Sequence, residues 1–149
     1  VLQDLRPSLM ALLRQLLSSR RRLQERGISM QDLGRNITQI DKVDLLSVIM
    51  EKKNDYWRLG QICCTYLDSE KIYEISYSFC KDLEVAHYRL VVAKDEGVPS
   101  ISRVYRAAIL YENEMRELFG LNVEHMKVDY QNKLYRIEAE TPFVPKEEN

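Results

Sequence analysis

Three consecutive strand candidates constrain the fold more than any other feature of this chain. They lie at residues 57–67, 71–80 and 85–93. In the middle stretch the apolar side chains fall on every second residue, at Tyr73, Ile75, Tyr77 and Phe79. Such alternation is typical of a strand with one buried face, and the short links between the stretches favour antiparallel neighbours. The sequence therefore predicts an antiparallel meander.

Two further elements are expected before the meander. Residues 36–40 are a strand candidate, and Asp41 is suited to cap a helix over 42–53. The apolar face predicted for this helix carries Val43, Leu46, Ile49 and Met50. Together these elements predict an α/β (α+β) domain in which an antiparallel sheet of three to four strands has its helices on one side.

A second helix is expected after the meander, over about residues 101–119. Pro99 disfavours helix at the residue before it, and Ser100 is a candidate N-cap. Gly120 is suited to the left-handed position that ends many helices. Beyond Gly120 we expect an extended, irregular tail that lies across another surface.

The segment 1–29 differs in composition from the rest of the chain. It holds six arginines, no lysine and two acids, and its leucine stripe predicts a helix over 7–26. Packing of the stripe on its own domain or on a neighbouring subunit is favoured over a helix lying on a membrane. Met30 is a candidate initiator, so the segment is either a lineage-specific helix or a product of start-site choice. We divide the chain into a basic amphipathic helix (1–29), an α/β domain (30–126) and an extended tail (127–149).

Several function classes find little support in the composition. The net charge is −1, and few basic residues accompany the strand aromatics, so no nucleic-acid partner is expected. The three cysteines form no Cys-x-x-Cys pair and are too few to ligate an iron–sulfur cluster. An odd number of cysteines favours reduced thiols in the cytoplasm. No Gly-rich phosphate-binding motif is present.

The acidic run LYENEMRELFG (110–120) is the sharpest local signal. On a helix, Glu112 falls in line with Ala108 and Met115, and a carboxylate on an apolar face needs a partner. Three interpretations stay open at this point. The run is a solvated acidic face, or Glu112 is buried against a cation or backbone amides, or the acids form a metal or acid–base site. The last is least favoured, because no His lies three or four residues from these glutamates.

The run VPSISRVYRAAILYENEMRELFGLNVEHM (98–126) resembles the signature of the complex I 30 kDa subunit family. That signature has a V-P-S entry and then E-R-E-x-x-D-x-F-G-I, and here Asn113, Glu117 and Leu121 replace its Arg, Asp and Ile. Respiratory members continue with Gly-His-Pro and D-L-R-R, whereas here Met126 follows His125. The E-N-E core, the L-F-G and the D-Y-x-x-K-L-Y-R segment ending in P-F are similar to relatives in energy-converting, membrane-bound nickel–iron hydrogenases. The resemblance covers about residues 36–143.

The resemblance implies a cofactor-free assembly subunit, peripheral on the cytoplasmic face of the cell membrane. Its partners would be the hydrogenase large subunit (complex I 49 kDa-like) and iron–sulfur subunits, which would carry the nickel–iron centre and the clusters. Ion-translocating membrane subunits would be reached indirectly. We expect Glu112 and Glu114 to hold the helix against the large subunit or to cap local backbone amides. No catalytic or metal residue is assigned, and the expected partner-binding residues are Arg106, Glu112, Glu114, Arg116, Glu117, Phe119 and Gly120.

Three rival functions stay open. The nearest is the equivalent subunit of an NADH:quinone oxidoreductase of the complex I type. A rival of another class is a small standalone enzyme that uses the acidic cluster with a metal ion. The third is an adaptor that binds a membrane or nucleic acid through its basic helix. Co-purified nickel, metal analysis of the isolated chain and deletion of 1–29 would separate these functions.

Overall fold

The computed structural model describes residues 37–135 and 137–146. The helix predicted over 7–26 and the domain boundary at residue 30 lie outside the described residues. The described elements are β1 (Ile37–Ile40), the 3-10 turn η1 (Lys42–Asp44), α2 (Leu45–Asn54), β2 (Arg58–Leu67), β3 (Ile72–Lys81), β4 (Glu84–Ala93), β5 (Val98–Pro99), α3 (Ala108–Phe119) and β6 (Val123–Glu124).

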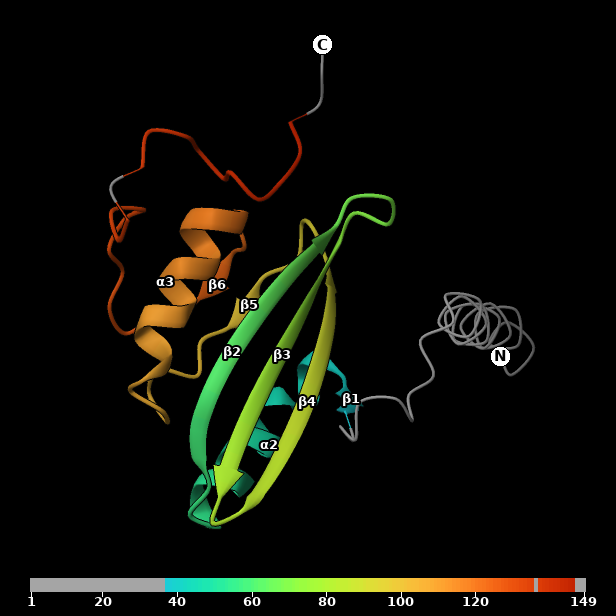
Figure 1. The fold of residues 1–149 in the computed structure, drawn as a ribbon, viewed down its shortest axis with the longest axis vertical. Coiled ribbons are helices and arrows are strands. Elements are labelled where there is room, and N and C mark those ends of the chain that lie inside the picture. The colour runs from blue at the N-terminus through green and yellow to red at the C-terminus, as the bar shows by residue number, and fades with distance from the viewer. Residues whose placement is uncertain (1–36, 136, 147–149) are drawn as a thin grey trace, which may run out of the picture. The chain divides into compact units, whose positions relative to one another are not determined.

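A four-stranded sheet with the order β1-β4-β3-β2 is the centre of the fold (Figure 1). β2, β3 and β4 run antiparallel through tight turns, so the predicted meander is confirmed. β1 adds a parallel edge beside β4, with Ile40 opposite Leu90. A separate short parallel ladder joins β5 to β6, with Val98 opposite Val123.

One face of this sheet forms the core. The alternating residues of β3 that were predicted to be buried point inward, and Ile75 and Phe79 are fully shielded from solvent. Both helices pack on this same face: α2 contributes Leu45 and Ile49, and α3 contributes Ala108 and Met115. The predicted α+β architecture with helices on one side is therefore confirmed.

The apolar face predicted for the first helix is confirmed at Ile49 and wrong at Val43, Leu46 and Met50. Leu45 and Ile49 are fully buried, whereas Val43, Leu46 and Met50 are 85%, 44% and 47% exposed. The chain forms a 3-10 turn before α2 begins at Leu45, and this turn sets which residues of α2 meet the sheet. Successive residues of a helix are rotated by about 100°, so a stripe displaced by one residue faces away from the core.

The predicted start of the second helix is also wrong. α3 begins at Ala108, and Ser100 does not cap it. Residues 101–107 form turns instead, in which the Val104 and Tyr105 amides donate to the carbonyl of Ile101. The predicted end is confirmed, because Gly120 adopts φ 70° in the left-handed region.

The chain after Gly120 is mainly irregular, as predicted, and it returns to α3. Leu121 and Val123 are buried in the core, and the Phe143 amide donates to the carbonyl of Leu118 (3.1 Å). A Cβ at Gly120 would lie 2.9 Å from Cγ2 of Thr141, so a larger residue there would collide with the tail. Gly120 thus serves both the helix end and the close approach of the tail.

Candidate functional site

The buried carboxylate of Glu112 holds the loop that leads into α3. Glu112 is 2% exposed. Its Oε1 accepts a hydrogen bond from the Ile101 amide, and its Oε2 accepts one from the Ser100 hydroxyl, both at 2.7 Å. Burial raises the pKa of Glu112, while hydrogen bonds from Ser100, Ile101 and Ser102 act in the opposite direction. The carboxylate is therefore part of the internal structure of the domain.

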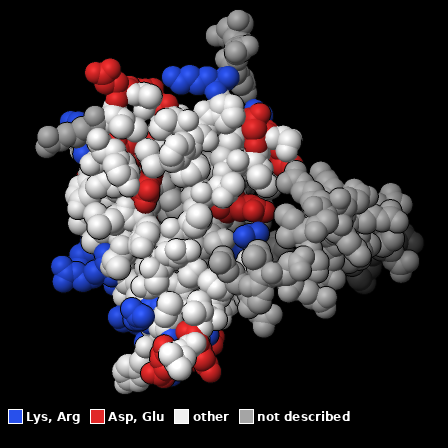
Figure 2. All heavy atoms as spheres, viewed as in Figure 1, with Lys and Arg blue, Asp and Glu red and all other residues white. Residues whose placement is uncertain are grey.

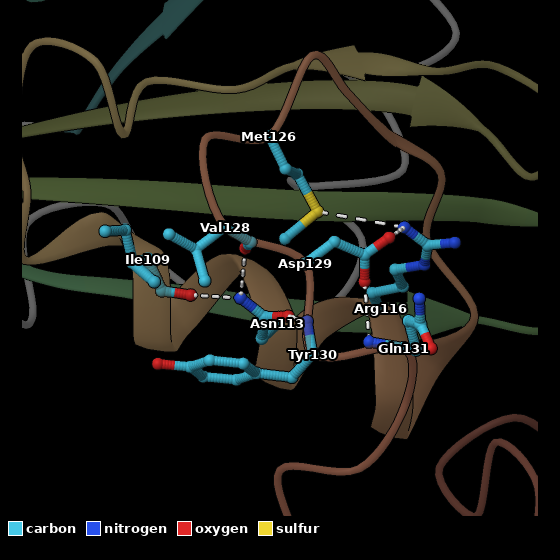
Figure 3. A network of polar contacts seen from close by, with 8 residues as sticks. All are labelled: Ile109, Asn113, Arg116, Met126, Val128, Asp129, Tyr130 and Gln131. Carbon is cyan, nitrogen blue, oxygen red and sulfur yellow. Dashed lines mark hydrogen bonds and ion pairs between the residues drawn. The ribbon is translucent and has the colours of Figure 1, made fainter.

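Asn113 binds the loop that follows β6 (Figure 3). Its Nδ2 donates to the carbonyls of Ile109 (2.7 Å) and Val128 (2.9 Å), and its Oδ1 accepts from the Tyr130 amide (2.8 Å). Asn113 is 3% exposed, and all three bonds are at least partly buried. The sequence interpretation treated Asn113 only as a replacement for arginine and missed this role. The only signal for this role in the sequence is the position of a short polar residue between two glutamates.

Arg116 fixes the same loop from the next turn of α3 (Figure 3). Its Nη1 lies 2.7 Å from Oδ2 of Asp129 and 4.0 Å from Sδ of Met126. Oδ1 of Asp129 accepts a hydrogen bond from the Gln131 amide (2.7 Å). The ion pair is partly exposed, so it fixes the position of the loop more than it stabilises the whole domain.

Glu117 and Glu114 hold the chain further along the tail. Glu117 is 4% exposed and accepts hydrogen bonds from the amides of Leu134 (2.7 Å) and Tyr135 (3.2 Å). Oε1 of Glu114 accepts a bond from the Tyr135 hydroxyl (3.0 Å). This hydrogen bond is the main cause that raises the pKa of Tyr135. We call Asn113, Glu114, Arg116 and Glu117, together with the segment 126–135 that they bind, the tail clamp.

The remaining residues expected at the site lie at the two ends of α3. The Phe119 carbonyl accepts a bond from the Tyr73 hydroxyl (2.8 Å), and its ring packs edge-on against Phe143 at 5.2 Å. Arg106 is exposed in the turn before α3, apart from the tail clamp. The structure thus brings six of the seven expected residues together along α3 and leaves Arg106 outside. Their binding of another subunit stays a prediction.

In the part of the chain that the structure describes, the thiols and carboxylates do not gather around a shared point. Residues 37–135 and 137–146 contain no group of three or more His, Cys, Asp and Glu side chains that could hold a metal ion. Cys63 is exposed and Cys64 faces the core, where burial and the neighbouring Cys63 raise the pKa of Cys64 to about 12. In the described part of the chain, no helix has the length and apolar character needed to cross a membrane.

Comparison with known proteins identifies the family. The sequence model of the 30 kDa subunit of respiratory-chain NADH dehydrogenase matches residues 36–137, which is most of the chain. The chain belongs to this family. No curated protein gives a significant match.

The fold of this 30 kDa-type subunit also occurs in a solved complex. A chain in the structure of the membrane-bound sulfane sulfur reductase (MBS), described as an archaeal respiratory membrane complex, superposes with a TM-score of 0.61. The two chains are 15% identical, and the match covers 86% of this chain and 81% of the other. At this identity the likeness establishes a shared fold.

Proposed function

We propose that this chain is a structural subunit, without a cofactor of its own, of a membrane-bound energy-converting nickel–iron hydrogenase complex. It docks on the large catalytic subunit and on the neighbouring iron–sulfur subunits at the cytoplasmic side of the membrane. The partner subunits carry the nickel–iron centre and the clusters, and the complex couples proton reduction or hydrogen oxidation to ion translocation. Membership of the 30 kDa family supports the role as a subunit, and the likeness to the MBS chain supports a membrane-bound complex.

The tail clamp is the observation that carries the structural role. The buried polar side chains of α3 form hydrogen bonds with backbone groups of this chain, so they stabilise the conformation of the loop and the tail. Asn113 and Glu117 together bind four backbone groups of the segment 128–135. A tail fixed in this way presents a preorganised surface, which lowers the entropy lost when a partner binds.

The hydrogenase branch is supported by the same segment. The D-Y-x-x-K-L-Y-R run at 129–136 is where the sequence departs from the respiratory pattern, and its described residues 129–135 lie in the tail clamp. The segment whose sequence distinguishes the hydrogenase branch from the respiratory branch is therefore part of the tail clamp, which is the candidate docking surface. A subunit of a quinone oxidoreductase is the alternative, favoured by the respiratory enzyme that gives the family its name.

Purification of the native complex tests the function. The chain is tagged in its own host, membranes are solubilised in mild detergent, and the recovered subunits are identified by mass spectrometry. We expect a large hydrogenase-type subunit, iron–sulfur subunits and stoichiometric nickel, with hydrogen evolution from a reduced ferredoxin-type carrier. A complex that lacks nickel and reduces quinone would contradict the hydrogenase assignment. Recovery of the chain alone would contradict the role as a subunit.

A further inference from the structure

Tyr56 occupies a backbone position that suits glycine far better than a bulky aromatic residue. The Trp57 amide donates to the Lys52 carbonyl (2.9 Å), and the Tyr56 amide donates to the Lys53 carbonyl (3.2 Å). This is the Schellman pattern at the C-terminus of α2, in which the residue at the Tyr56 position is left-handed and usually glycine. Tyr56 has φ 63°, and it is 89% exposed. A positive φ is uncommon for a bulky residue, and residues held in strained backbone conformations cluster at functional sites.

A groove of about 510 Å³ lies beside Tyr56. Two of its seven lining residues are charged, Lys53 and Arg58, and both are basic. Its aromatic floor is held in place, because the Tyr105 hydroxyl donates to the Trp57 carbonyl (2.7 Å). Nζ of Lys53 lies over the Tyr105 ring, 5.0 Å from its centre, which places a positive charge at the groove. The groove therefore offers apolar ring surface and positive charge together.

An exposed flank of α2 extends this surface. Leu46, Met50 and Lys53 are spaced at i, i+4 and i+7, so they share one side of the helix. Leu46 and Met50 are about half exposed, and Val43 in the preceding turn is 85% exposed. Figure 2 shows Lys and Arg atoms at the lower left of the molecule and atoms of both signs mixed at its lowest tip. We call Leu46, Met50, Lys53, Tyr56, Trp57, Arg58 and Tyr105 the α2 groove surface.

We propose that the α2 groove surface docks a segment of another protein subunit that carries an apolar or aromatic side chain flanked by carboxylates. This inference rests on the proposed function, because it assigns a second docking surface to a subunit of a complex. The apolar side chain enters the groove against Trp57 and Tyr105, and the carboxylates pair with Lys53 and Arg58. Tyr56 covers the inserted side chain. Aromatic and arginine residues around a desolvated pocket are typical of the residues that dominate binding.

A membrane surface fits the α2 groove surface less well. Segments that bind anionic lipids carry clusters of about four to eight Lys and Arg. The groove is lined by two basic residues, and the acidic Asp55 directly precedes Tyr56. A confined aromatic groove also has room for one inserted side chain, whereas a lipid surface presents many headgroups side by side.

The strain at Tyr56 makes a sharp test, because stability and docking should respond in opposite directions. In Tyr56→Gly the melting temperature of the isolated chain should equal or exceed that of the wild type, since glycine adopts positive φ without strain. Recovery of partner subunits with the tagged chain should fall about tenfold, as expected for loss of a dominant aromatic contact. Lys71→Gly is the matched control, because Lys71 also has positive φ (53°) but lies in the β2–β3 turn, at the other end of the sheet.

Each outcome of this test decides something. Normal partner recovery with Tyr56→Gly, or an equal loss with Lys71→Gly, overturns the α2 groove surface. A lower melting temperature for Tyr56→Gly overturns the claim that the residue is strained for docking. Absence of partners with the wild-type chain is a failure of the proposed function, and the fluorescence test below then decides the groove independently.

Trp57 is the single tryptophan of the chain, so its fluorescence reports directly on the groove. The full chain is titrated with a tryptophan-free peptide of alternating Glu and Phe, with a Lys–Phe peptide of equal length, and with phosphatidylserine vesicles. We expect the Glu–Phe peptide alone to shift the emission, and Arg58→Glu to weaken that response about tenfold. No response to the Glu–Phe peptide, an equal response to both peptides, or a vesicle response that Arg58→Glu abolishes overturns the proposal.

Discussion

Two opposing effects act on the pKa of Glu112. Its place among Ala108, Met115 and the core of the sheet disfavours the ionised form, and the amide of Ile101 and the hydroxyl of Ser100 favour it. Burial dominates, so the pKa is raised. At neutral pH the hydrogen bonds of Glu112 fix the loop before α3, while burial of its carboxyl group costs the domain some stability.

The raised pKa of Glu112 gives stability a definite pH dependence. A carboxyl whose pKa is higher in the folded than in the unfolded state stabilises fully below the unfolded value and loses that contribution as pH rises through the folded value. Urea unfolding of wild type and Glu112→Gln is measured from about pH 4 to 8, across the carboxyl range. We expect the wild type to lose stability relative to the variant as pH rises, by about 1.4 kcal/mol for each pH unit between the two pKa values.

Subtracting the two curves removes the other acids, because they titrate alike in both proteins. A difference that stays constant with pH would show that Glu112 titrates equally in the folded and unfolded states. Glu112→Ala is the second variant. It leaves the Ile101 amide without an acceptor and should lower the free energy of unfolding by about 1–3 kcal/mol at the acid end of the range. This difference from the wild type should shrink as pH rises, because the variant lacks the titrating carboxyl.

At the scale of an element, α3 acts as the part that fixes the tail. Glu112 binds the loop before the helix, and Asn113 and Glu117 bind the chain after it. The tail contacts of Asn113 and Glu117 are to backbone groups, whereas Arg116 and Glu114 bind the side chains of Asp129 and Tyr135. Gly120 completes the arrangement, because the tail approaches the helix end at Thr141.

Removal of the Glu117 carboxylate should release the tail locally. In Glu117→Ala the amides of Leu134 and Tyr135 lose their acceptor, and bonds to a charged group contribute about 1.5–3 kcal/mol. We expect faster hydrogen exchange at these two amides and faster tryptic cleavage after Lys133, with little change in the core strands. Glu114→Ala is the control, since it removes only an exposed bond to the Tyr135 hydroxyl. Equal cleavage in both variants would show that Glu117 does not hold the tail.

At the scale of the whole described molecule, the first residues after α3 belong to the core. Leu121 is fully buried, Val123 is 6% exposed, and β6 completes the ladder with β5. The later tail is different, because its apolar side chains Ile137 and Phe143 are about half exposed. The core and the tail therefore meet within 121–135.

Two truncations separate these parts. A chain ending at Gly120 loses Leu121 and Val123, and each buried aliphatic side chain contributes about 1–5 kcal/mol against a total of about 5–15 kcal/mol. We expect this chain to show no cooperative thermal transition by circular dichroism. A chain ending at Glu138 retains the tail clamp and should unfold cooperatively, a few degrees below the full chain. A cooperative transition in the shorter chain would place β6 outside the core.

The sequence by itself determined the parts of the fold that depend on local periodicity. Alternation through β3 indicated one buried face, and the short turn-like links indicated antiparallel neighbours. The left-handed preference of Gly120 ended α3, and the position of Glu112 in an apolar stripe marked it as a group that needs a partner. In each case the signal lies within a few residues of its consequence.

Tertiary structure alone decided the features that arise from residues far apart in the chain. Leu45, and not Leu46, faces the sheet because the preceding 3-10 turn sets the rotation of α2. α3 begins at Ala108, after turns in which the Ile101 amide donates to Glu112, eleven residues further along the chain. The bonds of Asn113 and Glu117 to the tail join residues 15 to 18 positions apart. Local sequence patterns do not predict such contacts, because the contacts depend on how the loop and the tail pack against the core.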